Sequence, residues 1–299
     1  MFSGVFRAIV TGMTAESRRV QLTNQGTHSV TSTDGVTIAG TVHGHGPPLV
    51  FLHGVIGDGD LDWQALLVHM TGRFTCHLPS WRGRGLSGDH PDLRFGRLVD
   101  DVLAYVDSIE GPTGLVGWSA GAGLALAAAG AQPHAVAAVA AVDPGMPGLM
   151  DTHEHAAFGD AVARMGELAA EDRLVDAVRA FAGFVFNGEE VAVAEDAGYL
   201  EATGRYAPTI LDFFHQQMEH AGPTADDPAV LGAISVPVLV LVGSEAKPYA
   251  TRAARYVTEH VSNARIHEIR GAGHAPLLTH PESLAEALVE FFTPAQQRA

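Results

Sequence analysis

A serine lies between two glycines in segment 117–121, which reads Gly-Trp-Ser-Ala-Gly. Apolar, β-prone residues precede Ser119 and an alanine-rich helical pattern follows it, so the segment predicts a strand, a sharp turn and a helix. Only small neighbours are tolerated at such a strained turn. The hydroxyl would stand above a helix N-terminus, where backbone N–H groups point outward. Alone, the pentapeptide also fits a chance occurrence in a chain rich in glycine and alanine.

A serine hydroxyl is a poor nucleophile at neutral pH and needs an adjacent base. His274 is the best candidate, because it lies in the loop 271–276, Gly-Ala-Gly-His-Ala-Pro, directly after the last expected strand. The C-terminal ends of parallel strands share one edge of a sheet, so His274 and Ser119 can meet there. Four other histidines are weaker candidates: His53, His77, His267 and His280.

Short apolar runs alternate with helical patterns along most of the chain. The expected strands are 27–33, 36–43, 49–52, 74–78, 115–117, 135–142, 236–242 and 264–269. The expected helices outside the middle of the chain are 60–70, 95–109, 119–131, 251–260 and 281–292. Uniformly apolar strands that alternate with helices predict an α/β protein with a mostly parallel eight-stranded sheet, covered by helices on both faces.

The middle of the chain has a different character. From 144 to 230 the strand-like runs disappear, and helical patterns alternate with Gly and Pro breaks. This predicts a helical cap, 144–230, inserted into a core domain formed by 27–143 and 231–299. Residues 1–26 have no firm pattern and are expected to form an N-terminal arm.

The cap carries many Met and Phe residues, and most of them would form its own core. A minority would face down and line an apolar pocket over Ser119, as ligand sites are mostly apolar. We expect Met146, Phe184 and Phe213 in that pocket. Trp118 either borders the pocket or packs in the core.

The whole arrangement resembles the α/β-hydrolase family over about residues 30–293. The matching motifs are His53-Gly54 after the third strand, 80–87 after the fourth, the serine turn at 117–121, and Gly273-His274 followed by Pro281-Glu282. The order of serine, acid and histidine along the chain is also that of the family.

The resemblance implies roles for individual residues. Ser119 would be the nucleophile, and His274 the general base and then the general acid. The backbone N–H groups of Val55 and Ala120 would form the oxyanion hole. His53 would organise its loop. For Arg82 and Arg84 we favour a structural salt bridge beneath the helix 93–109 over anion binding.

The acid of the triad departs from the family pattern. Family members commonly carry Asp at the fourth position of G-x-x-D after the strand that follows the insertion, and here that segment ends at Ala246. Asp143, at the end of the strand before the insertion, is our first choice for the acid, and Glu245 is the second. A His supported by water or by no acid is a third alternative. Asp143 could also be a helix N-cap before Pro144.

Charge and composition exclude several classes of function. The net charge of −16 argues against nucleic-acid binding, which depends on basic patches. No apolar run approaches the roughly 20 residues that span a membrane. Cys76 is the only cysteine and the histidines lack ligand spacing, so we expect neither a disulfide nor a metal, and no cofactor. The N-terminus lacks the features of a signal peptide, so cytoplasmic residence is expected.

These observations predict a serine hydrolase that cleaves a small-to-medium apolar ester or lactone through an acyl-enzyme. Two alternatives stay open: a hydrolase of carbon–carbon bonds that uses the same residues, and a receptor-like ligand-binding protein with little turnover. Dehalogenases and epoxide hydrolases of this fold need an aspartate nucleophile, and Ser119 speaks against both. A homodimer is compatible with the sequence.

Overall fold

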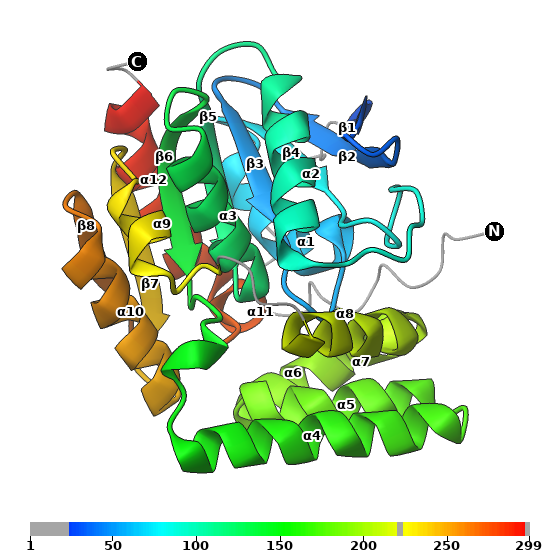
Figure 1. Ribbon diagram of the computed structural model, residues 1–299. Helices are drawn as coiled ribbons and strands as arrows, with labels where there is room; N and C mark the ends of the chain where they lie inside the picture. Colours follow the sequence, from blue (N-terminus) through cyan, green and yellow to red (C-terminus); the bar gives the residue numbers. More distant parts are fainter. Residues whose placement is uncertain (1–23, 220–223, 297–299) are drawn as a thin grey trace, which may run out of the picture.

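This computed structural model describes residues 24–219 and 224–296 of the 299-residue chain (Figure 1). Its centre is an eight-stranded sheet in the order β1-β2-β4-β3-β5-β6-β7-β8. The strands are β1 (Asn24–Thr31), β2 (Thr37–Gly44), β3 (Pro48–Leu52), β4 (Thr75–Pro79), β5 (Thr113–Trp118), β6 (Val136–Val142), β7 (Val238–Gly243) and β8 (Ala264–Ile269). Strand β2 pairs antiparallel with β1 and β4, and the other pairs are parallel. The predicted mostly parallel sheet is confirmed.

Helices cover both faces of this sheet (Figure 1). One group that packs together contains α2 (Phe95–Asp107), α3 (Ala120–Ala131), α9 (Pro228–Gly232) and α10 (Pro248–His260). The other group contains α1 (Gly59–Met70), α11 (Pro276–Thr279) and α12 (Pro281–Gln296). Strands β5 and β7 are buried throughout, which explains why their sequences are almost entirely apolar.

Five further helices lie between β6 and β7 in the sequence and pack together beyond the C-terminal ends of the parallel strands (Figure 1). These cap helices are α4 (Thr152–Ala170), α5 (Leu174–Val185), α6 (Gly188–Asp196), α7 (Tyr199–Thr203) and α8 (Ala207–Glu219). Their aromatic side chains pack on one another: the ring of Phe214 lies 5.3 Å from that of Phe158 and 5.0 Å from that of Phe181. This cluster explains why most Phe residues of the cap are not free to line a pocket.

Two predicted boundaries differ from the observed elements. Strand β1 begins at Asn24, inside the range 1–26 assigned to an arm, and residues 1–23 lie outside the described part of the chain. Helix α9 packs against α3, although it begins at Pro228, inside the predicted cap range 144–230. The division into arm, cap and core stays a prediction. Among the described residues, no helix has both the length and the apolar character needed to cross a membrane.

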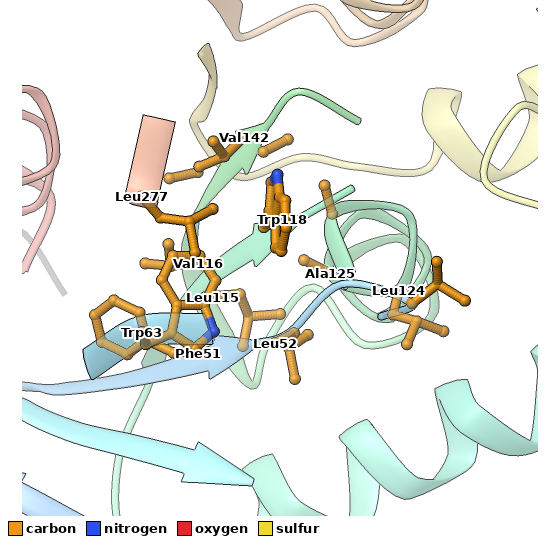
Figure 2. Packing of buried hydrophobic residues seen from close by; sticks show 14 of the residues in the cluster. Phe51, Leu52, Trp63, Leu115, Val116, Trp118, Leu124, Ala125, Val142 and Leu277 are labelled. Atoms are coloured by element: carbon orange, nitrogen blue, oxygen red, sulfur yellow. The ribbon is translucent and has the colours of Figure 1, made fainter. Parts of the chain in front are cut away.

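The core of the sheet positions the site. Phe51 on β3 meets Trp63 of α1 edge-to-face at 5.3 Å, and both side chains are completely buried (Figure 2). On the neighbouring strand β5, Leu115 and Val116 lead to Trp118, the last residue of that strand. The turn after Trp118 is thus attached to the most buried part of the molecule.

Candidate active site

Ser119 occupies the turn between β5 and α3 in a backbone conformation that is unusual for a side chain other than glycine. Its φ is 54° and its ψ is −120°, a region that costs energy and persists only when its surroundings enforce it. The N–H of Ser119 donates to Val142 O at 2.9 Å, and its carbonyl accepts the N–H of Gly145 at 3.0 Å. Residues at the end of β6 therefore hold the turn in place.

The two glycines of the pentapeptide are required by close backbone approach. A Cβ at Gly117 would lie 2.3 Å from the carbonyl oxygen of Gly121, and a Cβ at Gly121 would lie 2.2 Å from that of Leu52. The turn is therefore compressed between its own helix and β3. This explains physically why the spacing of the motif predicts the local structure.

Ser119, His274 and Asp143 form one buried hydrogen-bonded chain. Ser119 Oγ lies 3.1 Å from His274 Nε2, and His274 Nδ1 is hydrogen-bonded to Asp143 Oδ2. A neutral imidazole fits this arrangement when Nδ1 carries the proton and donates to the carboxylate, since Nε2 then accepts from the serine hydroxyl. The structure brings together the three residues that the sequence favoured for a nucleophile, a base and an orienting acid.

Asp143 is held directly after β6 with a φ of 43°. Its N–H donates to Leu241 O at 2.7 Å, which continues the pairing of β6 with β7. Burial raises the pKa of Asp143, and its contact with His274 opposes that shift. Its second oxygen, Oδ1, has no hydrogen-bond partner among the described residues. Asp143 therefore orients His274 through Oδ2, while Oδ1 remains able to accept a further hydrogen bond.

Glu245, the second choice for the acid, lies elsewhere. It is exposed on the loop after β7, where its N–H donates to Ala272 O at 2.8 Å. None of the hydrogen bonds within the described ranges joins Glu245 to His274. The geometry therefore supports Asp143 as the acid.

The loop 53–57, here called the His53 loop, carries Val55, whose N–H was predicted to stabilise an oxyanion. In the described part of the chain, neither this N–H nor that of Ala120 donates to a protein acceptor. His53 fixes the relevant peptide: its Nδ1 donates to Gly54 O at 2.7 Å, and its Nε2 accepts the N–H of Trp81 at 2.9 Å. Gly54 O and the N–H of Val55 belong to the same planar peptide, so His53 sets the direction of that N–H.

His53 acts here as a neutral side chain. Burial, and then the charge of Arg84, lower the pKa of His53 to about 3. The neutral ring has one donor and one acceptor, which matches its two hydrogen bonds. This geometry fits the loop-organising role that the resemblance implied.

Two buried ionisable residues that were not predicted to belong to the site, Asp62 and Arg84, also hold the His53 loop. Asp62 Oδ2 accepts the N–H of Gly54 at 2.8 Å. Arg84 Nη1 donates to Val55 O at 2.5 Å and to Gly57 O at 2.9 Å. Both side chains are buried. The sequence did offer one signal for Asp62: it is an acidic residue on the buried face of the predicted helix 60–70, where an apolar residue is expected.

The salt-bridge prediction is confirmed for one arginine and wrong for the other. Arg82 forms ion pairs with Asp34 at 2.8 Å and with Asp101 of α2 at 2.6 Å. Arg84 instead points to backbone carbonyls, and no ion pair within the described ranges includes it. The loop after β4 brings the two side chains to different partners, which their sequence spacing does not reveal.

Three of the predicted pocket residues form ring contacts between the segment 144–230 and the rest of the chain. The indole N–H of Trp118 donates to His274 O at 2.7 Å, and its ring stacks on Phe186 at 6.2 Å. Phe184 stacks on Tyr249 of α10 at 6.1 Å, and Phe213 lies 5.4 Å from Trp81.

The fourth, Met146, is buried and follows the glycine that binds the serine turn. All four side chains lie at or near the junction of cap and core. Their role in a pocket stays a prediction.

The fold and the serine–histidine–aspartate chain together define an α/β-hydrolase. The profile of the alpha/beta hydrolase family matches residues 49–287, so the chain belongs to this family. It is a hydrolase whose relatives include esterases.

Among its relatives is the pimeloyl-[acyl-carrier protein] methyl ester esterase of Chromobacterium violaceum, which is 27% identical over 265 residues, 83% of this chain and 94% of that protein. Pyrrolizixenacetamide deacetylase of Xenorhabdus hominickii is 32% identical over only 97 residues, 32% of this chain and 36% of that protein. Among solved structures, an alpha/beta hydrolase from Sphaerobacter thermophilus superposes with a TM-score of 0.70 at 29% identity, covering 89% of this chain and all of that one.

Proposed function

We propose that this protein is a serine esterase that cleaves a small-to-medium apolar carboxylic ester or lactone through an acyl-enzyme. The observation that carries the proposal is the buried chain from Ser119 Oγ through the ring of His274 to Asp143. A serine in hydrogen-bond reach of a base that is itself oriented by a carboxylate is the arrangement that activates a hydroxyl for acyl transfer.

The reaction uses each group in turn. His274 Nε2 takes the proton of Ser119 as Oγ attacks the ester carbonyl, and Asp143 stabilises the imidazolium that forms. The N–H groups of Val55 and Ala120 donate hydrogen bonds to the developing oxyanion; one such donor is worth roughly 3–4 kcal/mol. His274 then protonates the leaving alcohol. Water, deprotonated by the same ring, releases the acid and regenerates Ser119.

Charge supports an uncharged substrate. The segment 144–230 contains sixteen acidic and only four basic residues. A negatively charged molecule would be repelled from such a surface at low ionic strength. Aromatic side chains at the junction of cap and core, Trp81, Phe186 and Phe213 among them, favour apolar acyl groups instead.

A fluorophosphonate probe and a series of p-nitrophenyl esters, from acetate to dodecanoate, test the proposal. The wild-type protein should be labelled at one site and should hydrolyse the shorter and middle members of the series. Ser119→Ala should abolish both. An unlabelled wild type, or equal labelling of Ser119→Ala, would show that Ser119 is not the nucleophile. Stoichiometric binding of esters without turnover would support a receptor-like protein.

A further inference from the structure

Glu190 is a buried carboxylate on cap helix α6 that reaches the loop of the proposed base. It is only 1% exposed. Its Oε1 accepts the N–H of Ala275, the residue after His274, at 2.6 Å. We infer that Glu190 is a positioning residue, which holds His274 in line with Ser119 only while α6 is seated on the core. This inference rests on the proposed function and adds a residue to it.

The loop 271–276, here called the His274 loop, is held from two sides. From the core, Trp118 donates to the carbonyl oxygen of His274 at 2.7 Å. From the cap, Glu190 accepts from the next peptide. The two elements are in close contact, since a Cβ at Gly273 would lie 2.6 Å from both Asn187 Nδ2 and Glu190 Oε2. A displacement of α6 would therefore displace the loop.

Helix capping alone does not explain why Glu190 is buried. Its other oxygen, Oε2, accepts the N–H of Asn187 at 2.9 Å, and Asn187 Oδ1 accepts the N–H of Glu190, which completes a capping box. A capping box does not require a fully buried glutamate, since Glu154, whose side chain is 15% exposed, forms one with Asp151 on α4. Burying a carboxylate is unfavourable unless further hydrogen bonds compensate it. The hydrogen bond from the N–H of Ala275 to Oε1 compensates for the burial of Glu190.

The charge of Glu190 also acts on the site. It raises the pKa of Asp143, on the loop after β6, beyond the effect of burial. From the start of α10, Lys247 and Tyr249 also face this charge. Lys247 Nζ donates to Phe184 O, however, and no ion pair among the described residues neutralises Glu190. Removal of this charge should therefore lower the pKa of Asp143, the orienting acid.

The experiment compares Glu190→Ala and Glu190→Gln with two matched controls. Asn187→Ala breaks the same capping box without removing the acceptor of Ala275, and Glu189→Gln removes an exposed charge from the same helical turn. The readouts are the melting temperature, kcat and KM on the best ester, the rate of fluorophosphonate labelling, and the pH profile of kcat/KM.

We expect Glu190→Ala to lower kcat and the labelling rate about 10- to 100-fold, because a small displacement of a reacting group has effects of this size. KM should change little. Glu190→Gln keeps an acceptor for Ala275 and should restore part of kcat, while the acidic limb of its pH profile moves to lower pH. Asn187→Ala should lower the melting temperature but leave kcat within about threefold. Glu189→Gln should match the wild type.

Equal losses of kcat in Asn187→Ala and Glu190→Ala would reduce Glu190 to a helix cap and overturn the inference. So would wild-type kcat and an unshifted pH profile in both Glu190 variants. In those cases wild-type labelling at Ser119 would leave the proposed function standing. An unlabelled wild type would overturn both the proposed function and the inference.

Discussion

The indole N–H of Trp118 donates to the carbonyl oxygen of His274 at 2.7 Å, across 156 positions of sequence. The residue before the proposed nucleophile thus holds the loop of its base. The same ring lies against Gly54, where a Cβ would be only 2.9 Å from it. One completely buried side chain therefore contacts both the His53 loop and the His274 loop, and Figure 2 shows it at the end of β5 beside the core.

Trp118→Phe keeps an aromatic ring and removes this hydrogen bond. The carbonyl of His274 would be left buried without a donor, so we expect a loss of about 1–3 kcal/mol in the free energy of unfolding. We also expect kcat to fall about tenfold, because the His274 loop gains freedom. Urea unfolding and steady-state kinetics measure the two effects.

Trp63→Phe is the matched control. Trp63 is equally buried, and its Nε1 has no hydrogen-bond partner in the described part of the chain. This variant should lose stability through reduced packing while kcat stays at the wild-type value. A similar fall of kcat in both variants would mean that lost packing, and not the bond to His274, controls activity.

The position of Asp143 predicts a large asymmetry between two carboxylates. Asp143→Asn should lower kcat by about 10⁴-fold, because the amide favours the wrong tautomer of His274. Glu245→Gln should have no effect, since Glu245 is exposed and does not contact the ring. Steady-state kinetics on one ester checks both. The reverse ranking would return Glu245 to the role of the acid, and small losses in both would indicate a dyad.

A substitution at Gly145 tests whether the oxyanion binds at the N–H of Ala120. A Cβ there would lie 3.2 Å from the N–H nitrogen of Ala120 and 3.4 Å from Ser119 Oγ. Gly145→Ala should therefore lower kcat by about 10²-fold, comparable to the loss of one oxyanion donor. Gly123→Ala introduces a similarly close contact, 3.2 Å from Ala225, away from the hydroxyl, and should retain activity. Wild-type kcat in Gly145→Ala would argue against an oxyanion at Ala120.

The sequence predicted the elements whose signal is local. Apolar runs predicted the inner strands β3 to β7, because a strand covered on both faces excludes polar residues. Strands β1 and β8 are polar and largely exposed, so this reason does not apply to them. Ser119 and His274 were predictable for a related reason: each follows a strand at the shared C-terminal edge of the sheet. Asp143 was favoured over Glu245 only by analogy, and the side-chain geometry of the structure was needed to support it.

Other parts of the site depend on contacts that no local pattern encodes. The start of α6 is readable from Asn187 and Glu190 as a capping box. The partner of Glu190, however, is the N–H of Ala275, 85 positions away. Arg84 was misassigned for the same reason, because its acceptors are backbone carbonyls of a loop that arrives from β3. Backbone acceptors have no side-chain signature in a sequence.

The buried carboxyl of Asp62 should make the free energy of unfolding depend on pH. Burial raises the pKa of its carboxyl to about 8, although the N–H of Gly54 and the hydroxyl of Tyr199 donate to it. An unfolded aspartate titrates near pH 4, so between about pH 4 and pH 8 the folded protein holds a proton that the unfolded chain has lost. The contribution of Asp62 to stability should therefore fall as pH rises, by at most about 1.4 kcal/mol per pH unit, and level off above pH 8.

Asp62→Asn resembles the protonated carboxyl and cannot titrate, so it should remove this slope. Urea unfolding at several pH values between about 5 and 8 measures it, with Asp107→Asn, an exposed position at the end of α2, as the control. Parallel curves for the wild type and Asp62→Asn would show that Asp62 is charged throughout this range.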